Sequence, residues 1–406
     1  MVEILAVTLE SPRELRALEI LAKGDQIQRI DADHYRVSSQ SGNGSYQVVR
    51  HGKEWTCECP DHRFRQEVCK HIWSVYFSLN MRQKVVTRVQ PEIDVLAARP
   101  EGRCKWCDSK NVVSIGTRHN INGDVKRLRC KDCGRDFSDN EGFEGIKATP
   151  KAVTLALDSY FKGLSQRDIV DQLKNVEGIE VTQPTVHNWI RRYVEAMKSY
   201  LDKFTPQLGG IWHADETVIN VRKTEPIKIG HDDRLLNYSW MWNLMDHETR
   251  FLIASEITKH REIEDARKVL AEAKDVANGQ RPDFVITDKL QAYKQAITSE
   301  FYTNTNPKTQ HVRLKSLKEG TNNNIIERLH GTIKERTKVM RGMDTDESAK
   351  LLMEGNRIYY NYLRPHQALG SKTPAEKAGI DLRLEGKNPW EELIKRGKRS
   401  QRRKSV

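Results

Sequence analysis

The 406-residue sequence predicts an α/β core domain that follows small metal-binding modules and a pair of helices. Three observations support this prediction. Seven cysteines fall into two short groups in the first third of the chain, helical periodicity begins near residue 150, and strands alternate with helices after residue 208. At roughly 150 residues per domain, the length also favours more than one domain.

The charge of the chain favours a polyanionic partner. Lys and Arg total 68, Asp and Glu total 56, and the formal net charge is +12, an excess that is typical of proteins that bind nucleic acid. We find no run of the roughly 18 apolar residues that a membrane span needs, and Glu3 stands where a secretory leader would be basic. We therefore expect a folded cytoplasmic protein with DNA, and no membrane, as its partner.

Two Cys-x-x-Cys pairs predict a small zinc ribbon. The pairs are Cys104 with Cys107 and Cys130 with Cys133, and 22 residues separate them. With this spacing, two turns can hold one tetrahedral zinc ion through four thiolates. Free core cysteines are the alternative, but chance rarely gives two such pairs.

The remaining three cysteines and one histidine form a second possible zinc site. Cys57, Cys59, Cys69 and His71 give Cys-x-Cys, nine residues, then Cys-x-His, and Cys-x-Cys on a strand places both side chains on one face. The segment resembles the SWIM-type zinc finger, including the Cys-Pro after the first pair. His62 is close enough in sequence to replace His71. We expect two structural Zn²⁺ ions, in modules that bind DNA, bind protein or only stabilise the fold.

Two amphipathic helices within residues 149–205 form a helix-turn-helix pattern. Ser165 and Asp168 predict a capping box for the first helix, Gly178 lies in the turn, and Pro184 begins the second helix. An ordinary helical pair shows the same periodicity. If the pair binds DNA, the second helix presents polar groups to base edges and phosphates. These residues are Thr185, His187, Asn188, Arg191 and Arg192.

Alternating strands and helices follow from residue 208. The expected strands cover residues 211–221, 238–246, 250–257, 284–287 and 311–314, and a helix from about Glu262 to Val276 joins the third and fourth. Three strands in a meander, then helix, strand, helix and strand, is the order of a ribonuclease-H-like (retroviral-integrase-like) mixed sheet flanked by helices.

Three acids of this domain predict a site for divalent metal ions. Asp215 lies in the first strand, where neighbouring side chains point in opposite directions, so we expect only one of Asp215 and Glu216 to face the site. Asp288 follows the fourth strand, and Glu327 lies on a helix whose outer row is otherwise basic. Two aspartates and a glutamate offer the hard oxygen ligands that two Mg²⁺ (or Mn²⁺) ions need for phosphoryl transfer. The basic residues of the row, suited to phosphates, include His330, Lys334 and Lys338.

Four motifs resemble those of DDE transposases, most closely the insertion-sequence transposases of the IS-six type. They read WHADET, VITDKL, NNNIIERLHGTIKERTKVMRG and YNYLRPHQALGSKTP. With the two preceding helices, the resemblance covers roughly residues 150–380. It implies that Asp215, Asp288 and Glu327 form a metal-binding catalytic triad and that Arg328 and Lys334 touch DNA. The zinc modules are a departure, since the shortest family members lack them.

The resemblance also implies an activity. One metal ion would activate water to cut an element end, and the freed 3′-hydroxyl would attack target DNA while the second ion steadies the leaving oxygen. We expect a prokaryotic, nucleoid-associated insertion-sequence transposase that binds terminal inverted repeats and target DNA as a homodimer or larger assembly. A catalytically silent, transposase-derived DNA-binding regulator is the alternative. A structure-acting nuclease or ribonuclease H is a third hypothesis.

The predicted domains follow one another along the chain. They are a strand-rich N-terminal region with the SWIM-type finger (1–80), a linker (81–100), a four-cysteine zinc ribbon (101–145), a helix-turn-helix region (149–205), a ribonuclease-H-like DDE domain (208–380) and a basic tail (381–406). The last segment carries seven basic groups and no acid over residues 395–404. We therefore expect a disordered arm there, either solvated or in contact with phosphates.

Overall fold

The chain forms two compact units, each built from segments that are distant in sequence. A computed structural model describes residues 11–42, 44–86, 103–120, 123–223, 237–288, 290–301, 309–314, 323–340, 343–384 and 388–404. The first unit comprises Met1–Gln90, Thr205–Lys334 and Pro365–Ile380, and the second comprises Pro91–Phe204, Glu335–Arg364 and Asp381–Val406. Within the described ranges, no helix is long and apolar enough to cross a membrane.

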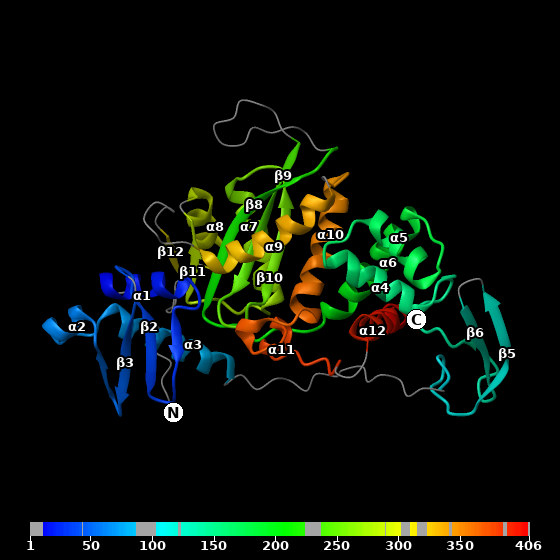
Figure 1. Cartoon of the computed structure of the whole chain (residues 1–406), viewed down its shortest axis with the longest axis horizontal. Coiled ribbons are helices and arrows are strands. Elements are labelled where there is room, and N and C mark those ends of the chain that lie inside the picture. Colours follow the sequence, from blue (N-terminus) through cyan, green and yellow to red (C-terminus); the bar gives the residue numbers. More distant parts are fainter. Residues whose placement is uncertain are drawn as a thin grey trace. The chain divides into compact units, whose positions relative to one another are not determined.

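The first unit contains a five-stranded mixed sheet in the order β10-β9-β8-β11-β12. Its strands are β8 (Ile211–Asn220), β9 (Tyr238–Asp246), β10 (Leu252–Thr258), β11 (Phe284–Thr287) and β12 (Gln310–Arg313). β8, β9 and β10 form an antiparallel meander, seen side by side in Figure 1, and β11 runs parallel to both β8 and β12. This is the predicted ribonuclease-H-like order, and each predicted strand boundary lies within two residues of the observed one.

Helices cover both faces of this sheet. On one face are α7 (Ile263–Val276) and α8 (Gln291–Phe301), and rings of α8 pack edge-on against strand tryptophans: Phe301 against Trp212 and Tyr293 against Trp242. The first part of α9 (Asn324–Met340) lies on the opposite face, where His330 contacts Asn243 of β9. The short helices η3 (Gln367–Leu369) and α11 (Pro374–Lys377) complete the unit.

The N-terminal part of the first unit is a four-stranded antiparallel sheet with three helices. The strands, in sheet order, are β1 (Ile27–Arg29), β2 (His34–Ser38), β3 (Ser45–His51) and β4 (Glu54–Cys57), and the helices are α1 (Pro12–Ala22), α2 (Pro60–Arg65) and α3 (Lys70–Val86). The region that we predict to be strand-rich, residues 1–80, also contains α1, which begins where Ser11 accepts a hydrogen bond from the Glu14 amide and Pro12 occupies the first turn. α3 also extends into the predicted linker, of which residues 87–100 lie outside the described residues.

Helices α1 and α3 join this N-terminal module to the five-stranded sheet. One side of α1 and α3, represented by Leu18 and Phe77, packs against Phe284 of β11, Ile211 of β8 and their neighbours in one apolar cluster. The other side contributes Ile20, Ile72 and Val75 to a second cluster, which contains three buried cysteines. α1 and α3 therefore pack both in the core of the N-terminal module and against the five-stranded sheet.

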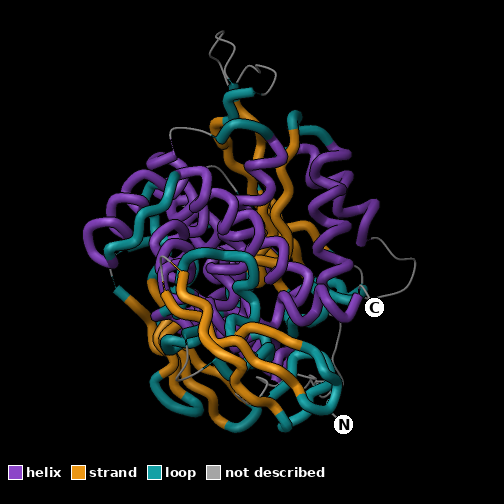
Figure 2. The backbone as a smooth tube through the Cα atoms, turned by 90° about the vertical axis from the view of Figure 1, so that its right-hand side faces the viewer, coloured by secondary structure: helices purple, strands orange, loops and turns teal. Residues whose placement is uncertain are grey.

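The second unit combines a small sheet with a helical bundle. The sheet contains β5 (Val112–Asn120), β6 (Gly123–Cys130) and β7 (Asp136–Ser138), and the long β5–β6 hairpin is drawn in orange in Figure 2. The helices are α4 (Pro150–Phe161), α5 (Gln166–Glu177), α6 (Gln183–Leu201), α10 (Asp346–Ile358) and α12 (Pro389–Lys404), with a π-helical turn, η2 (Tyr359–Leu363), after α10. The predicted capping box of Ser165 and Asp168 begins α5, and Val186, Trp189 and Ile190 form the buried side of α6.

The prediction of a disordered basic arm at the C-terminus is wrong, because residues 389–404 form α12, which packs on α6. Trp390 stacks on Phe161 and donates a hydrogen bond to Asp158. Arg396 is only 2% exposed, pairs with Glu392 and donates to the carbonyl of Leu382. The acids one turn before the basic run neutralise part of its charge.

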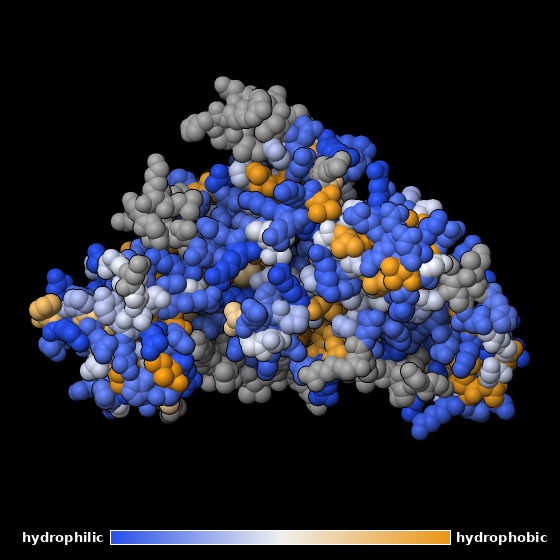
Figure 3. Space-filling model, viewed as in Figure 1, coloured by the Kyte–Doolittle hydropathy of each residue, from blue (hydrophilic) through white to orange (hydrophobic). Residues whose placement is uncertain are grey.

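Apolar side chains lie mainly inside the units. The face of the molecule in Figure 3 is largely hydrophilic, with apolar residues in small separate groups, as expected for a chain with 31% charged residues. Stability therefore depends on close packing within each unit, and the contact between α12 and α6 offers a direct test.

We predict that Gly397→Ala destabilises the protein although alanine favours helix. A Cβ at position 397 would lie 2.5 Å from the backbone oxygen of Ala196, so α12 must move away from α6, at a cost of about 1–3 kcal/mol. Urea unfolding measures the change. Gly331→Ala in α9 is the control, because its Cβ meets nothing within 4 Å, and there we expect a gain of about 0.5–1 kcal/mol. Equal stability of the two variants would contradict the close contact.

Candidate active site

Three carboxylates converge beside the end of β11. One oxygen each of Asp215, Glu216 and Asp288 lies within 4.8 Å of the others. β8 pairs with β11 only as far as His213, so the two acids of β8 lie beyond the paired residues, and Asp288 follows the last residue of β11. In sheets with parallel strands, the space beyond the strand ends is where ligands commonly bind.

Asp215 and Glu216 have their partners on opposite faces of β8. Nδ1 of His330 on α9 lies 3.5 Å from Oδ2 of Asp215, whereas the Tyr293 hydroxyl on α8 donates a hydrogen bond of 2.8 Å to Glu216. The prediction that only one of the two acids can face the site is nevertheless wrong. Both carboxylates reach Asp288, because β11 has already ended at this level and both side chains can bend around the open edge.

Glu216 is buried and paired with a cation. Its side chain is 2% exposed, and Nη2 of Arg261 lies 2.5 Å from its Oε1 and 3.8 Å from Oδ2 of Asp288. The guanidinium of Arg261 also lies over the ring of Trp240, at 4.8 Å from the centroid. Burial and the charge of Asp288 raise the pKa of Glu216, and Arg261 opposes this shift. Sequence analysis missed Arg261, which precedes α7 without a distinguishing motif.

Asp215 lies in an unfavourable environment for a charged carboxylate. Burial, and then the charges of Glu216, Asp288 and Glu327, raise its pKa to about 8. Its neighbour His330 is neutral at pH 7, because burial and the nearby Lys334 lower the pKa of His330 to about 4. A divalent cation would relieve the repulsion, and carboxylate oxygens are the ligands that Mg²⁺ and Mn²⁺ prefer. The donor set therefore fits such an ion.

A chain of hydrogen bonds orients His330 toward Asp215. Ser255 donates to Oδ1 of Asn243 at 3.0 Å, which leaves Nδ2 of Asn243 to donate to Nε2 of His330 at 3.1 Å. Nδ1 of His330 then carries the proton and faces Asp215. The DNA contact of His330 stays a prediction, and the structure shows that this side chain is 6% exposed and bonded to Asn243 inside the site.

Glu327 lies near this cluster without being one of the three acids that converge. Its side chain is exposed, but its charge contributes to the raised pKa of Asp215. The residue before α9, Asn323, is attached to β8: Nδ1 of His213 lies 2.6 Å from its Oδ1, and its Nδ2 donates to the carbonyl of Ala214. The helix that carries Glu327 thus begins beside Asp215.

His213 is another residue that sequence analysis missed. It is fully buried, and this burial lowers its pKa to about 3. The neutral ring stacks on His247, whose Nδ1 lies 2.9 Å from Nε2 of His213. Its position two residues before Asp215 on the same strand was the available signal, since both side chains face α9.

The first predicted zinc site comes together around His71. Cys57, Cys59, Cys69 and His71 are all buried and form one group, and both Cys57 and Cys69 lie 3.9 Å from Nδ1 of His71. The ring of His62 instead contacts the carbonyl of Glu67 at 2.7 Å, so His71 is the fourth member. Three thiols and an imidazole are a donor set that fits zinc.

The second cysteine group also comes together as predicted. Sγ of Cys104 lies 3.6 Å from that of Cys133, and Sγ of Cys107 lies 3.6 Å from that of Cys130. The backbone amide of Trp106 donates to Cys104, an arrangement that stabilises a thiolate. Four sulfurs from two turns fit a tetrahedral zinc ion.

The side chains that we predict to contact DNA differ in their exposure and in their contacts within the protein. His187, Asn188 and Arg191 are exposed on α6, as are Lys334 and Lys338 on α9. Thr185 is bonded to Thr182, and Arg192 donates to the carbonyl of Glu144. Arg328 forms an ion pair of 2.5 Å with Asp25. Thr185, Arg192 and Arg328 therefore take part in contacts within the protein, as does His187, whose Nδ1 lies 3.4 Å from Nε2 of Gln166.

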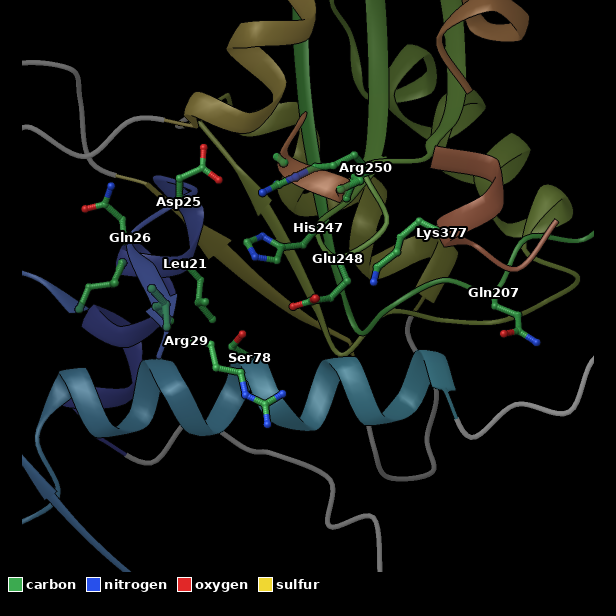
Figure 4. Close-up of a pocket in the computed structure, with 14 residues that line it drawn as sticks. Leu21, Asp25, Gln26, Arg29, Ser78, Gln207, His247, Glu248, Arg250 and Lys377 are labelled. Atoms are coloured by element: carbon green, nitrogen blue, oxygen red, sulfur yellow. The ribbon is translucent and has the colours of Figure 1, made fainter. Parts of the chain in front are cut away.

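A cavity of about 730 Å³ lies elsewhere in the first unit. Figure 4 shows its lining. Leu21 comes from α1, Asp25 from the turn after it and Arg29 from β1, whereas His247 and Arg250 come from the turn after β9. The described residues that line it do not include the three converging carboxylates. This cavity is therefore separate from the candidate active site.

The mixed sheet and its acids define a ribonuclease-H-like domain with a site suited to divalent metal. Residues 210–366 match the family model of the DDE domain of IS240-type transposases. The match assigns this segment, which is less than half of the chain, to the DDE domains of transposases, a class of enzymes.

Solved structures of other transposases give weaker similarities. The Mos1 mariner paired end complex with Mn is 13% identical over 59% of this chain and 76% of that chain, with a TM-score of 0.25. The pre-cleavage Mos1 transpososome is 10% identical over 62% and 77%, with a TM-score of 0.22. No curated protein matches the chain.

We predict that Asp215→Asn stabilises the protein in Mg²⁺-free buffer. The folded-state pKa of about 8 exceeds the ordinary value of 3.8, so between these values folding takes up a proton, and wild-type stability falls as pH rises from about 4 to 8. The variant avoids this penalty. Urea unfolding should show a gain of roughly 1–4 kcal/mol at pH 8 that shrinks toward pH 5.

Asp275→Asn on the exposed side of α7 is the control for this measurement, and we expect no such pH-dependent gain. An Asp215→Asn variant that is no more stable than wild type at pH 8 would show that the carboxylates do not repel one another as the structure indicates.

Proposed function

We propose that the chain is an insertion-sequence transposase that binds the terminal inverted repeats of its element, cuts the DNA ends and joins each freed 3′-hydroxyl to target DNA. The observation that carries the proposal is the convergence of Asp215 and Asp288 in a segment of the DDE transposase family. Its place of action is the prokaryotic nucleoid, where it works as a homodimer or a larger assembly that brings two ends together.

Asp215, Asp288 and Glu327 would hold two Mg²⁺ or Mn²⁺ ions. When bound, such ions supply a nucleophile at neutral pH and stabilise charge on the attacking and leaving oxygens. Neighbouring residues of the chain fix the positions of the carboxylates. Nδ1 of His330 faces Asp215 at 3.5 Å, and Arg261 with Tyr293 holds the carboxylate of Glu216 on the α8 side.

DNA contact in this proposal comes from two helices. The exposed His187, Asn188 and Arg191 on α6 suit base edges and phosphates, and the exposed Lys334 and Lys338 on α9 suit the phosphates of a DNA end. Arg192 and Thr185 support α6 through their own hydrogen bonds. Two structural Zn²⁺ ions would complete the cysteine groups.

The carboxylate cluster argues against a silent regulator. Burial of mutually repelling acids costs folding free energy, and a protein that only binds DNA gains nothing from that cost. Asp215, whose pKa is about 8, is the kind of group that a metal-dependent enzyme keeps for its reaction.

We predict that the purified protein contains about two zinc ions per chain. Each group offers four N or S ligands, the usual number for a structural site. Mass spectrometry of the native protein measures the content. Cys69→Ser and Cys130→Ser should each lose one ion, since they remove a ligand from different groups. A metal content near zero in correctly folded wild type would refute both sites.

We predict that Asp288→Ala abolishes strand transfer and leaves end binding intact. The assay contains magnesium, a labelled oligonucleotide with the element's end and a plasmid target, and gel shift measures end binding separately. The substitution removes a carboxylate from the metal site, so product should fall by at least about 10³-fold. Asp275→Ala, which removes an exposed acid from α7, is the matched control and should retain activity.

Each other outcome of this assay is informative. Product from both wild type and Asp288→Ala would show that Asp288 has been assigned wrongly. Absence of product from both, with end binding intact, would favour the regulator. Cleavage of an RNA–DNA hybrid without any terminal repeat would favour a ribonuclease.

A further inference from the structure

The turn that leaves α1 contacts the first turn of α9. The side-chain amide of Asn324 donates to the carbonyl of Lys23 at 3.3 Å, and Arg328 forms an ion pair of 2.5 Å with Asp25. Between these two contacts, Gly24 lies against Ile325. Three consecutive residues of the N-terminal module therefore meet one face of a single helical turn.

The backbone of this turn is built for close approach. Gly24 and Asp25 both have positive φ angles, of 65° and 49°, and such a conformation is unfavourable for aspartate unless its surroundings maintain it. A Cβ at Gly24 would lie 3.0 Å from Cγ1 of Ile325. The two left-handed residues direct the Lys23 carbonyl and the Asp25 carboxylate toward α9.

The same turn of α9 carries Glu327. On its other side, Asn323 is attached to β8 through His213 and Ala214. The backbone of Glu327 is therefore fixed between β8, which carries Asp215, and the N-terminal module. Upstream of the turn, Ile20 of α1 packs in the cluster that contains Cys57, Cys59 and Cys69, so the cysteine site and α9 are connected through one helix.

We propose that the turn Lys23–Asp25 positions Glu327 and makes the N-terminal module a working part of the catalytic centre. This inference rests on the proposed function, in which Glu327 holds metal. In this proposal, Arg328 forms an ion pair with Asp25, whereas the sequence predicts that it contacts DNA. Because the ion pair is exposed, with side-chain exposures of 67% and 49%, it adds little to global stability, and its loss acts locally on α9.

Charge-reversal substitutions of Asp25 and Arg328 test the proposal. Asp25→Arg and Arg328→Asp each place like charges together, so amide exchange in residues 326–330 should become about tenfold faster and strand transfer should fall about tenfold. The double variant Asp25→Arg with Arg328→Asp restores the pair with reversed polarity. We expect it to return both quantities to within about twofold of wild type.

Arg65→Asp is the matched control. Arg65 is 66% exposed and pairs with Asp61 on α2. Arg65→Asp therefore makes the same change of charge as Arg328→Asp, at a similarly exposed ion pair that lies within α2. Unchanged amide exchange in Asp25→Arg would overturn the proposal. So would weakened end binding in Arg328→Asp that the double variant does not restore, because Arg328 would then contact DNA. Amide exchange decides the matter independently of strand transfer, whose failure in wild type would defeat only the proposed function.

Discussion

Repulsion among carboxylates at the open edge of β8 is the constraint around which the first unit is organised. Asp215, Glu216 and Asp288 share a space where β11 has ended, and the charge of Glu327 adds to it. Acids held this close are unfavourable unless a cation joins them. The surrounding residues do not remove the repulsion on the Asp215 side, and this is the property expected of a metal site that has to bind and release its ions.

The acids on the two faces of the sheet have different partners. On the α8 face, Arg261 and Tyr293 supply a charge and a hydrogen bond to Glu216. On the α9 face, Asp215 meets a neutral histidine whose tautomer is fixed by Asn243 and Ser255. The first arrangement satisfies an acid within the protein, whereas the second orients an acid and leaves its charge available. The distinction is consistent with the proposed function, in which Asp215 holds metal and Glu216 supports the site.

Sequence patterns predicted the elements whose cause is local. The five strands, the capping box at Ser165 and the two cysteine groups depend on alternation, capping and ligand spacing, all of which are visible along the chain. Arg261 and Asn243 escaped prediction, because their importance arises only when separate elements meet. α12 was missed because seven basic groups outweighed a less obvious signal: Trp390, Leu393 and Ile394 on one face and acids one turn earlier.

The role of the N-terminal module follows from the same dependence on neighbours. A strand such as β11 is buried on both faces, so its apolar side chains need cover from helices on each side. α1 and α3 give Phe284 and Ile286 that cover, and their opposite sides surround the first cysteine group. Zinc binding at that group would thus stabilise the helices that cover the catalytic sheet. A module of this kind has reason to persist in the chain even if it never touches DNA.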